Sequence, residues 1–180
     1  TCGFLEDTVG HLIDVLQVRP ERVAHDLHPD FESTRFAADF ARTRGLPAIP
    51  VQHHHAHLVS VMVEHGLRTA TLGLALDGVG LGNDGGAWGG ELLRLDGIAC
   101  ERLGHVQPLR LPGGDRAARE PWRMAVSALH DAGLAYRVGG WIRQYYPGRD
   151  PAPLLTMLDR NLRCPSTTSL GRWFDVAAGV

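Results

Sequence analysis

The chain has 180 residues, of which 44% are apolar and 21% charged, a globular composition with ample material for a hydrophobic core. Its formal net charge of −2 offers no basic field for holding nucleic acid by its phosphates. No stretch approaches the roughly 18 consecutive apolar residues of a membrane span. The first residues also lack the charged region and apolar run of a signal peptide.

The first part of the sequence predicts helices that alternate with short extended segments. Apolar residues at helical spacing predict a helix over residues 8–17, and residues 21–30 then turn extended. Ser33 is a candidate N-cap for a helix that Gly45 ends. A short extended run over residues 48–52 leads into a histidine-rich helix that reaches to about Gly66.

The sequence after this helix begins with strands and ends with helices. Residues 69–77 are almost continuously apolar, as in a strand buried on both faces. A long glycine-rich loop over residues 78–90 follows, and then two strands joined by a turn at Gly97. Helices are expected over residues 116–132 and 134–145, and the remainder is mainly helical. Strands with helices between them favour an α/β fold.

Four histidines occur within five positions, in the segment VQHHHAHLV. His53 and His57 are four residues apart, so their rings can converge on one metal ion from one face of a helix. No glutamate follows His53, which excludes the metalloprotease helix. Asp77, at the end of the apolar strand, is the best candidate for a third ligand, and such a set suits iron, zinc or manganese. Purely structural histidines are the alternative.

The glycine-rich loop formally contains G-x-G-x-x-G at Gly80, Gly82 and Gly85. A strand rather than a helix is expected to follow it, which argues against a dinucleotide fold, and no Walker lysine is present. A strand–loop–strand segment of this kind can bring bare backbone N–H groups close to a phosphate. A flexible surface turn is the alternative.

The three cysteines, Cys2, Cys100 and Cys164, are far apart and form no C-x-x-C pair, so we expect reduced thiols in a cytoplasmic protein. None is nominated as a covalent nucleophile, and the catalytic residues stay unknown. His25, Asp26 and His28 form a second polar group, whose role is open between a structural turn and the lining of a site.

Five segments in order carry a resemblance to a known family: HDLHPDFESTRFA, VQHHHAHLVSVMVEHGL, LALDGVGLGNDGGAWGGELL, LPGGDRAAREPWRMA and TTSLGRWFDVAAG. Together they resemble the HypF family of carbamoyltransferases, which mature nickel–iron hydrogenases, over residues 23–180. The full proteins of that family also carry an acylphosphatase-like domain, zinc-finger modules and a domain that makes carbamoyl adenylate. The resemblance implies that residues 1–180 are the first part of the C-terminal carbamoyl-transfer domain, and both ends of the chain look cut.

The resemblance also implies the fold and the site. The expected fold is an α/β lobe of the actin/Hsp70/sugar-kinase type (ribonuclease H-like), with a mixed sheet flanked by helices. His53, His57 and Asp77 are expected to bind a divalent metal, either iron or zinc, with a further aspartate beyond residue 180. The residues expected around the nucleotide and the carbamoyl group are Gly78, Gly80, Gly89, Gly90, Glu91, Gly171 and Asp175. One departure is Trp173, where the family pattern has a smaller aliphatic residue.

The implied reaction begins with ATP and carbamoyl phosphate, which another domain converts into carbamoyl adenylate. The carbamoyl group then passes to the C-terminal cysteine thiolate of a partner maturation protein, on the route to the cyanide ligand of the hydrogenase. No nucleic acid or membrane partner is expected. Two other functions stay open: a metal-dependent hydrolase that uses His53, His57 and Asp77 to activate water, and a nucleotide-binding scaffold without chemistry.

Overall fold

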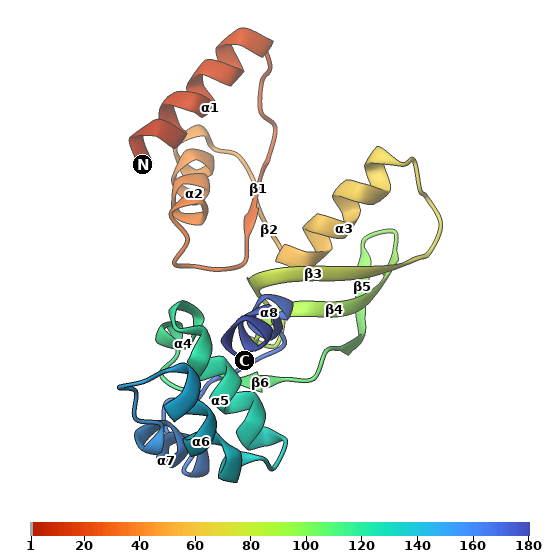
Figure 1. Cartoon of the computed structure of the whole chain (residues 1–180). Coiled ribbons are helices and arrows are strands. Elements are labelled where there is room, and N and C mark those ends of the chain that lie inside the picture. Colours follow the sequence, from red (N-terminus) through yellow and green to blue (C-terminus); the bar gives the residue numbers. More distant parts are fainter. Residues whose placement is uncertain (1) are drawn as a thin grey trace.

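The computed structural model describes residues 2–180, with side chains from residue 3 onward. It is an α/β structure in which a parallel strand pair and a five-stranded mixed sheet are flanked by helices (Figure 1). The elements in chain order are α1 (Cys2–Leu16), β1 (Val23–Asp26), α2 (Glu32–Arg44), β2 (Ala48–Val51), α3 (His53–Glu64), β3 (Thr71–Leu81), β4 (Ala87–Asp96), β5 (Ala99–His105), β6 (Leu109–Arg110), α4 (Asp115–Arg119), α5 (Pro121–Asp131), α6 (Ala135–Tyr145), α7 (Ala152–Asp159), β7 (Ser166–Thr167) and α8 (Leu170–Gly179).

The first unit is a strand–helix–strand crossover. β1 and β2 pair in parallel, and α2 makes the connection that a parallel pair requires. α1 packs beside α2, away from the rest of the molecule (Figure 1). Because the strands are parallel and in register, Asp26 and Val51 end side by side. The histidine-rich helix therefore begins next to the carboxyl end of β1.

The second unit is an antiparallel sheet of β3, β4 and β5, with α3 packed on one face (Figure 1). Leu93 and Leu95 of β4 have no exposed surface, and they form a core with side chains of α3. On the other face Leu72, Leu74 and Leu76 are each more than half exposed. The prediction of a strand buried on both faces is therefore wrong, because these three leucine side chains stay exposed.

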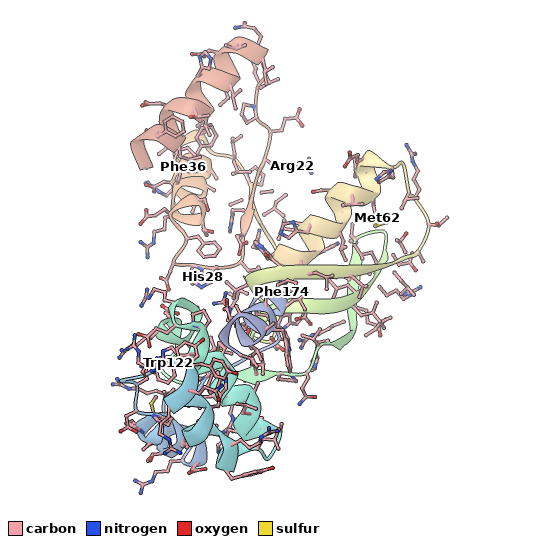
Figure 2. The ribbon with its side chains drawn as sticks, viewed as in Figure 1. Arg22, His28, Phe36, Met62, Trp122 and Phe174 are labelled. Carbon is pink, nitrogen blue, oxygen red and sulfur yellow. The ribbon has the colours of Figure 1, made fainter. Side chains whose placement is uncertain are left out.

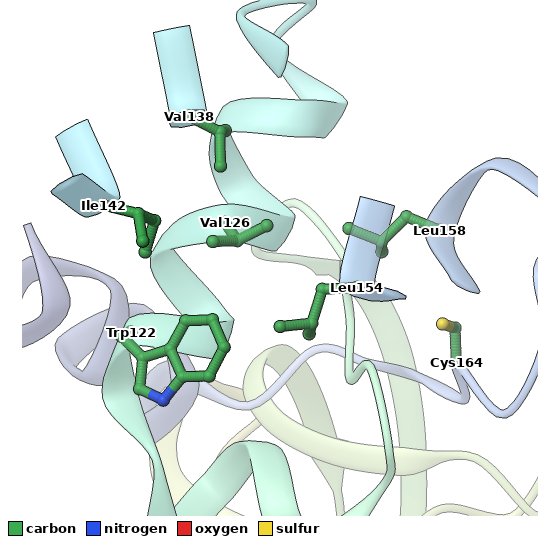
Figure 3. Close-up of a cluster of buried hydrophobic side chains, with 7 residues drawn as sticks. All are labelled: Trp122, Val126, Val138, Ile142, Leu154, Leu158 and Cys164. Carbon is green, nitrogen blue, oxygen red and sulfur yellow. The ribbon is translucent and has the colours of Figure 1, made fainter. Parts of the chain in front are cut away.

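The third unit is helical. Figure 3 shows its core, in which side chains of α5, α6 and α7 meet in one cluster. The cluster consists of Trp122, Val126, Val138, Ile142, Leu154, Leu158 and Cys164. α8 lies between this unit and the sheet and contacts α5 and β3. The lack of a side chain at Gly179 lets the end of α8 approach the backbone of Pro121, at the start of α5.

Two predicted boundaries are wrong for reasons visible in the backbone. The helix expected over residues 116–132 is divided into α4 and α5, because Glu120 is non-helical and Pro121 starts a new helix. α2 is capped at Phe31 rather than at Ser33. The ring of Phe31 stacks on His28 with centroids 4.4 Å apart, which fixes the entry of the chain into this helix.

The glycine-rich segment is a hairpin rather than a long loop. β3 continues to Leu81 and β4 already begins at Ala87, so the loop itself covers only residues 82–86. Gly80 pairs with Trp88 and Leu81 with Ala87. Gly85, with φ +77°, supplies the left-handed conformation that the tight turn requires.

Trp173, the departure from the family pattern, is accommodated on α8. Its indole Nε1 donates to the carbonyl of Gln107 at 2.9 Å, and its ring packs against the cluster that contains Leu109 and Met124.

Cys100 and Cys164 are free thiols, whereas the prediction for the thiol of Cys2 falls outside the described side chains. Over the described residues, no helix combines the length and apolarity needed to cross a membrane.

Candidate functional site

The start of α3 is fixed by one glutamine side chain. Gln52 caps the helix, with its Oε1 accepting from the backbone N–H of His55 at 2.7 Å. Its Nε2 donates to the carbonyl of Leu81 at 3.1 Å and lies 3.0 Å from Nδ1 of His54. The first turn of α3 is therefore tied to the end of β3. His54 is fully buried beneath this turn, and burial lowers its pKa, so it is a neutral structural histidine.

Asp77, the candidate for the third metal ligand, lies where β3 loses its pairing with β4. The register is interrupted between Leu76 and Gly80, so residues 77–79 form an irregularity in the strand. Such interruptions turn a side chain away from the regular alternation of the sheet. The interruption places the carboxylate of Asp77 beneath the first turn of α3.

His53, His57 and Asp77 converge at this point, with one potential ligand atom from each lying within 4.8 Å of the others. The Nε2 atoms of His53 and His57 are 3.2 Å apart. Oδ2 of Asp77 is 2.9 Å from Nε2 of His53 and 3.5 Å from Nε2 of His57. Figure 1 shows the common location, where the start of α3 meets β3. The helical spacing of the two histidines thus gives the convergence that the sequence predicts.

The donor set suits a divalent metal. Imidazole nitrogens and carboxylate oxygens bind such ions at about 2.0–2.2 Å, which places the ligand atoms of a tetrahedral site about 3.3–3.6 Å apart. The nitrogen–nitrogen separation and the longer of the two nitrogen–oxygen separations come close to this spacing. The shorter His53–Asp77 contact has the length of a hydrogen bond, whose proton an ion would replace.

A second carboxylate contacts His53 from the opposite side. Nδ1 of His53 lies 2.6 Å from Oδ2 of Asp26, at the end of β1. Burial disfavours the charged imidazole, but the hydrogen bonds to Asp26 and Asp77 outweigh it, so the pKa of His53 is raised. Burial also works against ionised Asp77, yet the bonds from the backbone N–H of Gly78 and from His53 leave its pKa lowered.

A cavity of about 310 Å³ opens beside two of the ligand candidates, His53 and His57. His25, Asp26, His53 and His57 contribute to its wall. The side chain of His57 is 59% exposed, whereas that of His53 is 25% exposed. A small molecule could therefore approach the metal-ligand atoms from this side.

Glycines allow the backbone to pack closely around Asp77. A Cβ on Gly80 would lie 2.7 Å from the rings of both His53 and His54. On Gly89 it would lie 2.7 Å from the carbonyl oxygen of Asp77, and on Gly171 it would lie 3.2 Å from Cα of Gly78. These glycines bring β3, β4 and α8 together at Asp77.

Two of the other predicted glycines have different surroundings. A Cβ on Gly90 would meet Val106 and the carbonyl oxygen of Thr168, so this position also requires glycine for packing. A Cβ on Gly78 would meet nothing within 4 Å. Gly78 therefore faces open space, but its backbone N–H donates to Asp77 and its carbonyl accepts from Ser169.

α8 begins against this same backbone. Ser169 is the N-cap, and its hydroxyl accepts from the backbone N–H of Arg172 at 3.2 Å and donates to the carbonyl of Gly78. The positive end of the helix dipole thus lies beside Asp77 and Gly78. Asp175, one turn further along, pairs with Arg172 at 2.8 Å.

Glu91, also expected near the nucleotide or the carbamoyl group, lies inside the protein beside the glycine backbone. Its side chain is completely buried, with Oε2 2.6 Å from Nε of Arg102. Oε1 accepts from the backbone N–H groups of Gly89 and Gly90 and from the hydroxyl of Thr168. Burial by itself would raise the pKa of Glu91. The hydrogen bonds to its carboxylate outweigh burial, so the pKa is lowered. The carboxylate thus holds the backbone of Gly89 and Gly90 in place.

Sequence reasoning missed several residues that support the site. Ser169, Thr168 and Arg102 were not singled out, although each fixes a predicted glycine or glutamate. The TTS run before an apolar helix was the available signal for a helix cap. Nothing in the sequence pairs Arg102 with Glu91, because their contact depends on the β4–β5 register.

Comparison with known proteins identifies the family of the chain. Residues 73–180 match the family model described as the second subdomain of the carbamoyltransferase Kae1-like domain, and residues 1–64 match the model of the HypF Kae1-like domain. The chain belongs to the HypF carbamoyltransferase family. The resemblance noted in the sequence motifs is thereby confirmed.

Curated HypF proteins match the chain along nearly its whole length. Carbamoyltransferase HypF2 of Cupriavidus necator is 57% identical over 100% of this chain and 22% of its own length. A carbamoyltransferase HypF homolog of the same organism is 50% identical over 99% of this chain and 45% of its own length. Carbamoyltransferase HypF of Rhizobium leguminosarum bv. viciae is 47% identical over 98% of this chain and 22% of its own length. The chain thus spans less than half of the length of these relatives.

Solved HypF structures share the fold. Full-length HypF in its phosphate- and nucleotide-bound form aligns with a TM-score of 0.84 at 34% identity, covering 98% of this chain and 23% of that one. HypF of T. kodakarensis aligns with a TM-score of 0.85 at 33% identity, covering 98% of this chain and 24% of that one. The predicted fold class is therefore confirmed.

Proposed function

We propose that residues 1–180 form part of a carbamoyl-transfer domain of a longer HypF protein. In this proposal the domain passes a carbamoyl group from carbamoyl adenylate to the C-terminal cysteine thiolate of a hydrogenase maturation partner. The observation that carries the proposal is the convergence of His53, His57 and Asp77 in a chain of this family. The crystal structure of a nucleotide-bound HypF supports the nucleotide part of the proposal.

His53, His57 and Asp77 would hold the divalent metal, iron or zinc, and a further aspartate beyond residue 180 would complete the site. A metal at this position would stabilise the negative charge that develops on the carbamoyl oxygen during attack. The open cavity beside His57 gives the carbamoyl group a route to this position.

The chain's own backbone would hold the phosphate of carbamoyl adenylate. The open space beside Gly78 and the start of α8 face the same place, next to Asp77, and α8 would supply the donors because the N–H of Gly78 is already bonded to Asp77. Backbone N–H groups and a helix N-terminus favour an anion. In the transfer, a sulfur–carbon bond forms, the bond from carbon to the AMP phosphate oxygen breaks, and AMP leaves with the electron pair.

The attacking thiol would come from the partner. Burial raises the pKa of the Cys100 thiol, and burial likewise raises the pKa of Cys164, although Arg110 opposes it there. A raised pKa leaves little thiolate near neutral pH, so neither side chain is suited to nucleophilic attack.

The proposal is tested by following carbamoyl transfer directly. The chain, extended past residue 180 to the length of its relatives, is given carbamoyl adenylate and a peptide that ends in cysteine. We expect one AMP released for each carbamoyl group found on the peptide by mass spectrometry. The His53→Ala/His57→Ala variant should lose this transfer together with its bound metal. His65→Ala, which removes an exposed histidine beyond the same helix, serves as the matched control.

Other outcomes would contradict the proposal in distinct ways. AMP release that is equally fast without the peptide would indicate the metal-dependent hydrolase. Nucleotide binding that survives both chelators and the double variant, with no carbamoylated peptide, would indicate the scaffold without chemistry.

A further inference from the structure

The segment HDLHPD, residues 25–30, forms a rigid turn between β1 and α2 (Figure 2 labels His28 there). The backbone N–H of His28 donates to Oδ1 of Asp26 at 2.8 Å, and the N–H of Asp30 donates to Nδ1 of His28 at 3.2 Å. The stacked rings of His28 and Phe31 hold the turn from outside. The ring of His28 thus helps to hold the turn, and the backbone N–H of the same residue fixes the carboxylate of Asp26.

The other oxygen of Asp26 is directed at the metal-ligand candidates. Oδ2 lies 2.6 Å from Nδ1 of His53, and the two side chains are only 15% and 25% exposed. Asp26 itself is not part of the convergent ligand set, because His53 uses its other nitrogen, Nε2, toward His57 and Asp77. The carboxylate thus acts on the ring from the side opposite to the metal position.

We propose that Asp26 is a positioning residue of the metal seat: it accepts the Nδ1–H of His53 and so directs the lone pair of Nε2 toward the metal. This inference rests on the proposed function, because it assumes that His53 is a ligand. A neutral imidazole carries one N–H, and the partner of that N–H decides which nitrogen can bind a metal. Residues that hold a ligating histidine in this way change metal affinity by about 10–100-fold when they are replaced.

Both oxygens of Asp26 are in use, which makes Asp26→Asn the informative variant. Asparagine can form the same turn, since its one oxygen can accept the N–H of His28. Its amide group would then face Nδ1 of His53 as a donor and favour the tautomer with the proton on Nε2. The variant therefore keeps the structural role of Asp26 and removes the positioning role.

The experiment measures zinc affinity by chelator competition, and thermal unfolding of the metal-free protein, in four forms of the chain extended past residue 180: wild type, Asp26→Asn, His53→Ala and Asp30→Asn. Asp30→Asn is the matched control, because that carboxylate belongs to the same turn but pairs with Arg35 at the surface. We expect Asp26→Asn to bind zinc about 10–100-fold more weakly. Its metal-free unfolding temperature should match that of Asp30→Asn.

The outcomes separate this inference from the proposed function. Wild-type zinc affinity in Asp26→Asn, with affinity lost in His53→Ala, would overturn the positioning role and leave the metal seat intact. A lower unfolding temperature in Asp26→Asn with unchanged zinc affinity would also overturn it, since the carboxylate would then be purely structural. Absence of zinc binding in the wild type would overturn the metal seat, and the role of Asp26 with it.

Discussion

The carboxylate of Glu91 and the guanidinium of Arg102 form an ion pair across β4 and β5, with 2.6 Å between Oε2 and Nε. Glu91 has no exposed side-chain surface, whereas Arg102 retains 22%. Arg102 also lies over the ring of Trp88, 4.1 Å from its centroid. The pair thus joins the glycine backbone, the indole and the neighbouring strand into one unit behind the site.

We expect Glu91→Gln to destabilise the fold by about 2–4 kcal/mol, because the amide leaves the guanidinium of Arg102 without its buried partner. Chemical denaturation measures this change. Asp96→Asn is the control, since the Arg94–Asp96 pair on the same strand is about half exposed and should change stability by about 0–1 kcal/mol. Equal effects of the two substitutions would mean that the buried pair contributes no more than a surface pair.

Gly89→Ala should destabilise the protein by about 1–3 kcal/mol, whereas Gly78→Ala should leave its stability nearly unchanged. The new Cβ at position 89 would meet backbone atoms of Asp77 and Ser169 at 2.7 and 2.9 Å, and backbone cannot move as a flexible side chain can. At position 78 the space is open. Thermal unfolding of the two variants makes the comparison, and a stable Gly89→Ala protein would contradict the close packing of β4 on β3.

Glu120 should make stability dependent on acid pH. Its hydrogen bonds from Arg123 at 2.5 Å and from Arg116 at 2.8 Å lower its pKa to about 2. A carboxyl whose pKa is lowered by folding stabilises the protein above its ordinary value of 4.5, and the stabilisation is lost as the pH falls toward 2.

Glu120→Gln is therefore expected to cost about 1–3 kcal/mol near neutral pH and progressively less below pH 4.5. Denaturant unfolding of wild type and variant at several pH values measures the difference. A difference that stays constant from pH 7 to the acid range would show that the charge of Glu120 is not the cause.

The helical core provides the fourth test. Leu158 is 1% exposed in the cluster of Figure 3, and Leu158→Ala should destabilise the protein by about 2–5 kcal/mol through lost burial and a cavity. Leu162, which is 52% exposed just beyond α7, gives the control, with an expected change within about 0.5 kcal/mol for Leu162→Ala. Similar losses in both variants would contradict the assignment of this core.

Local sequence signals predicted the elements well where a strong breaker or a clear period was present. Gly45 ends α2 in the left-handed conformation, and Gly97 makes the turn between β4 and β5. The prediction failed at residues 116–132, where the disruption by Pro121 was underestimated. It also failed for the length of the glycine loop, because hairpin pairing extends both strands into the glycines.

The sequence by itself determined the family, the α/β class and the pairing of His53 with His57, because motif order and helical spacing are local properties of the chain. Only the tertiary structure decided what surrounds them. The register break in β3 turns Asp77 toward the histidines, the parallel pairing of β1 with β2 brings Asp26 to the opposite side of His53, and the β4–β5 register buries Glu91 against Arg102. These contacts join residues 11 to 27 positions apart, and such distances close only when strands pair and helices pack.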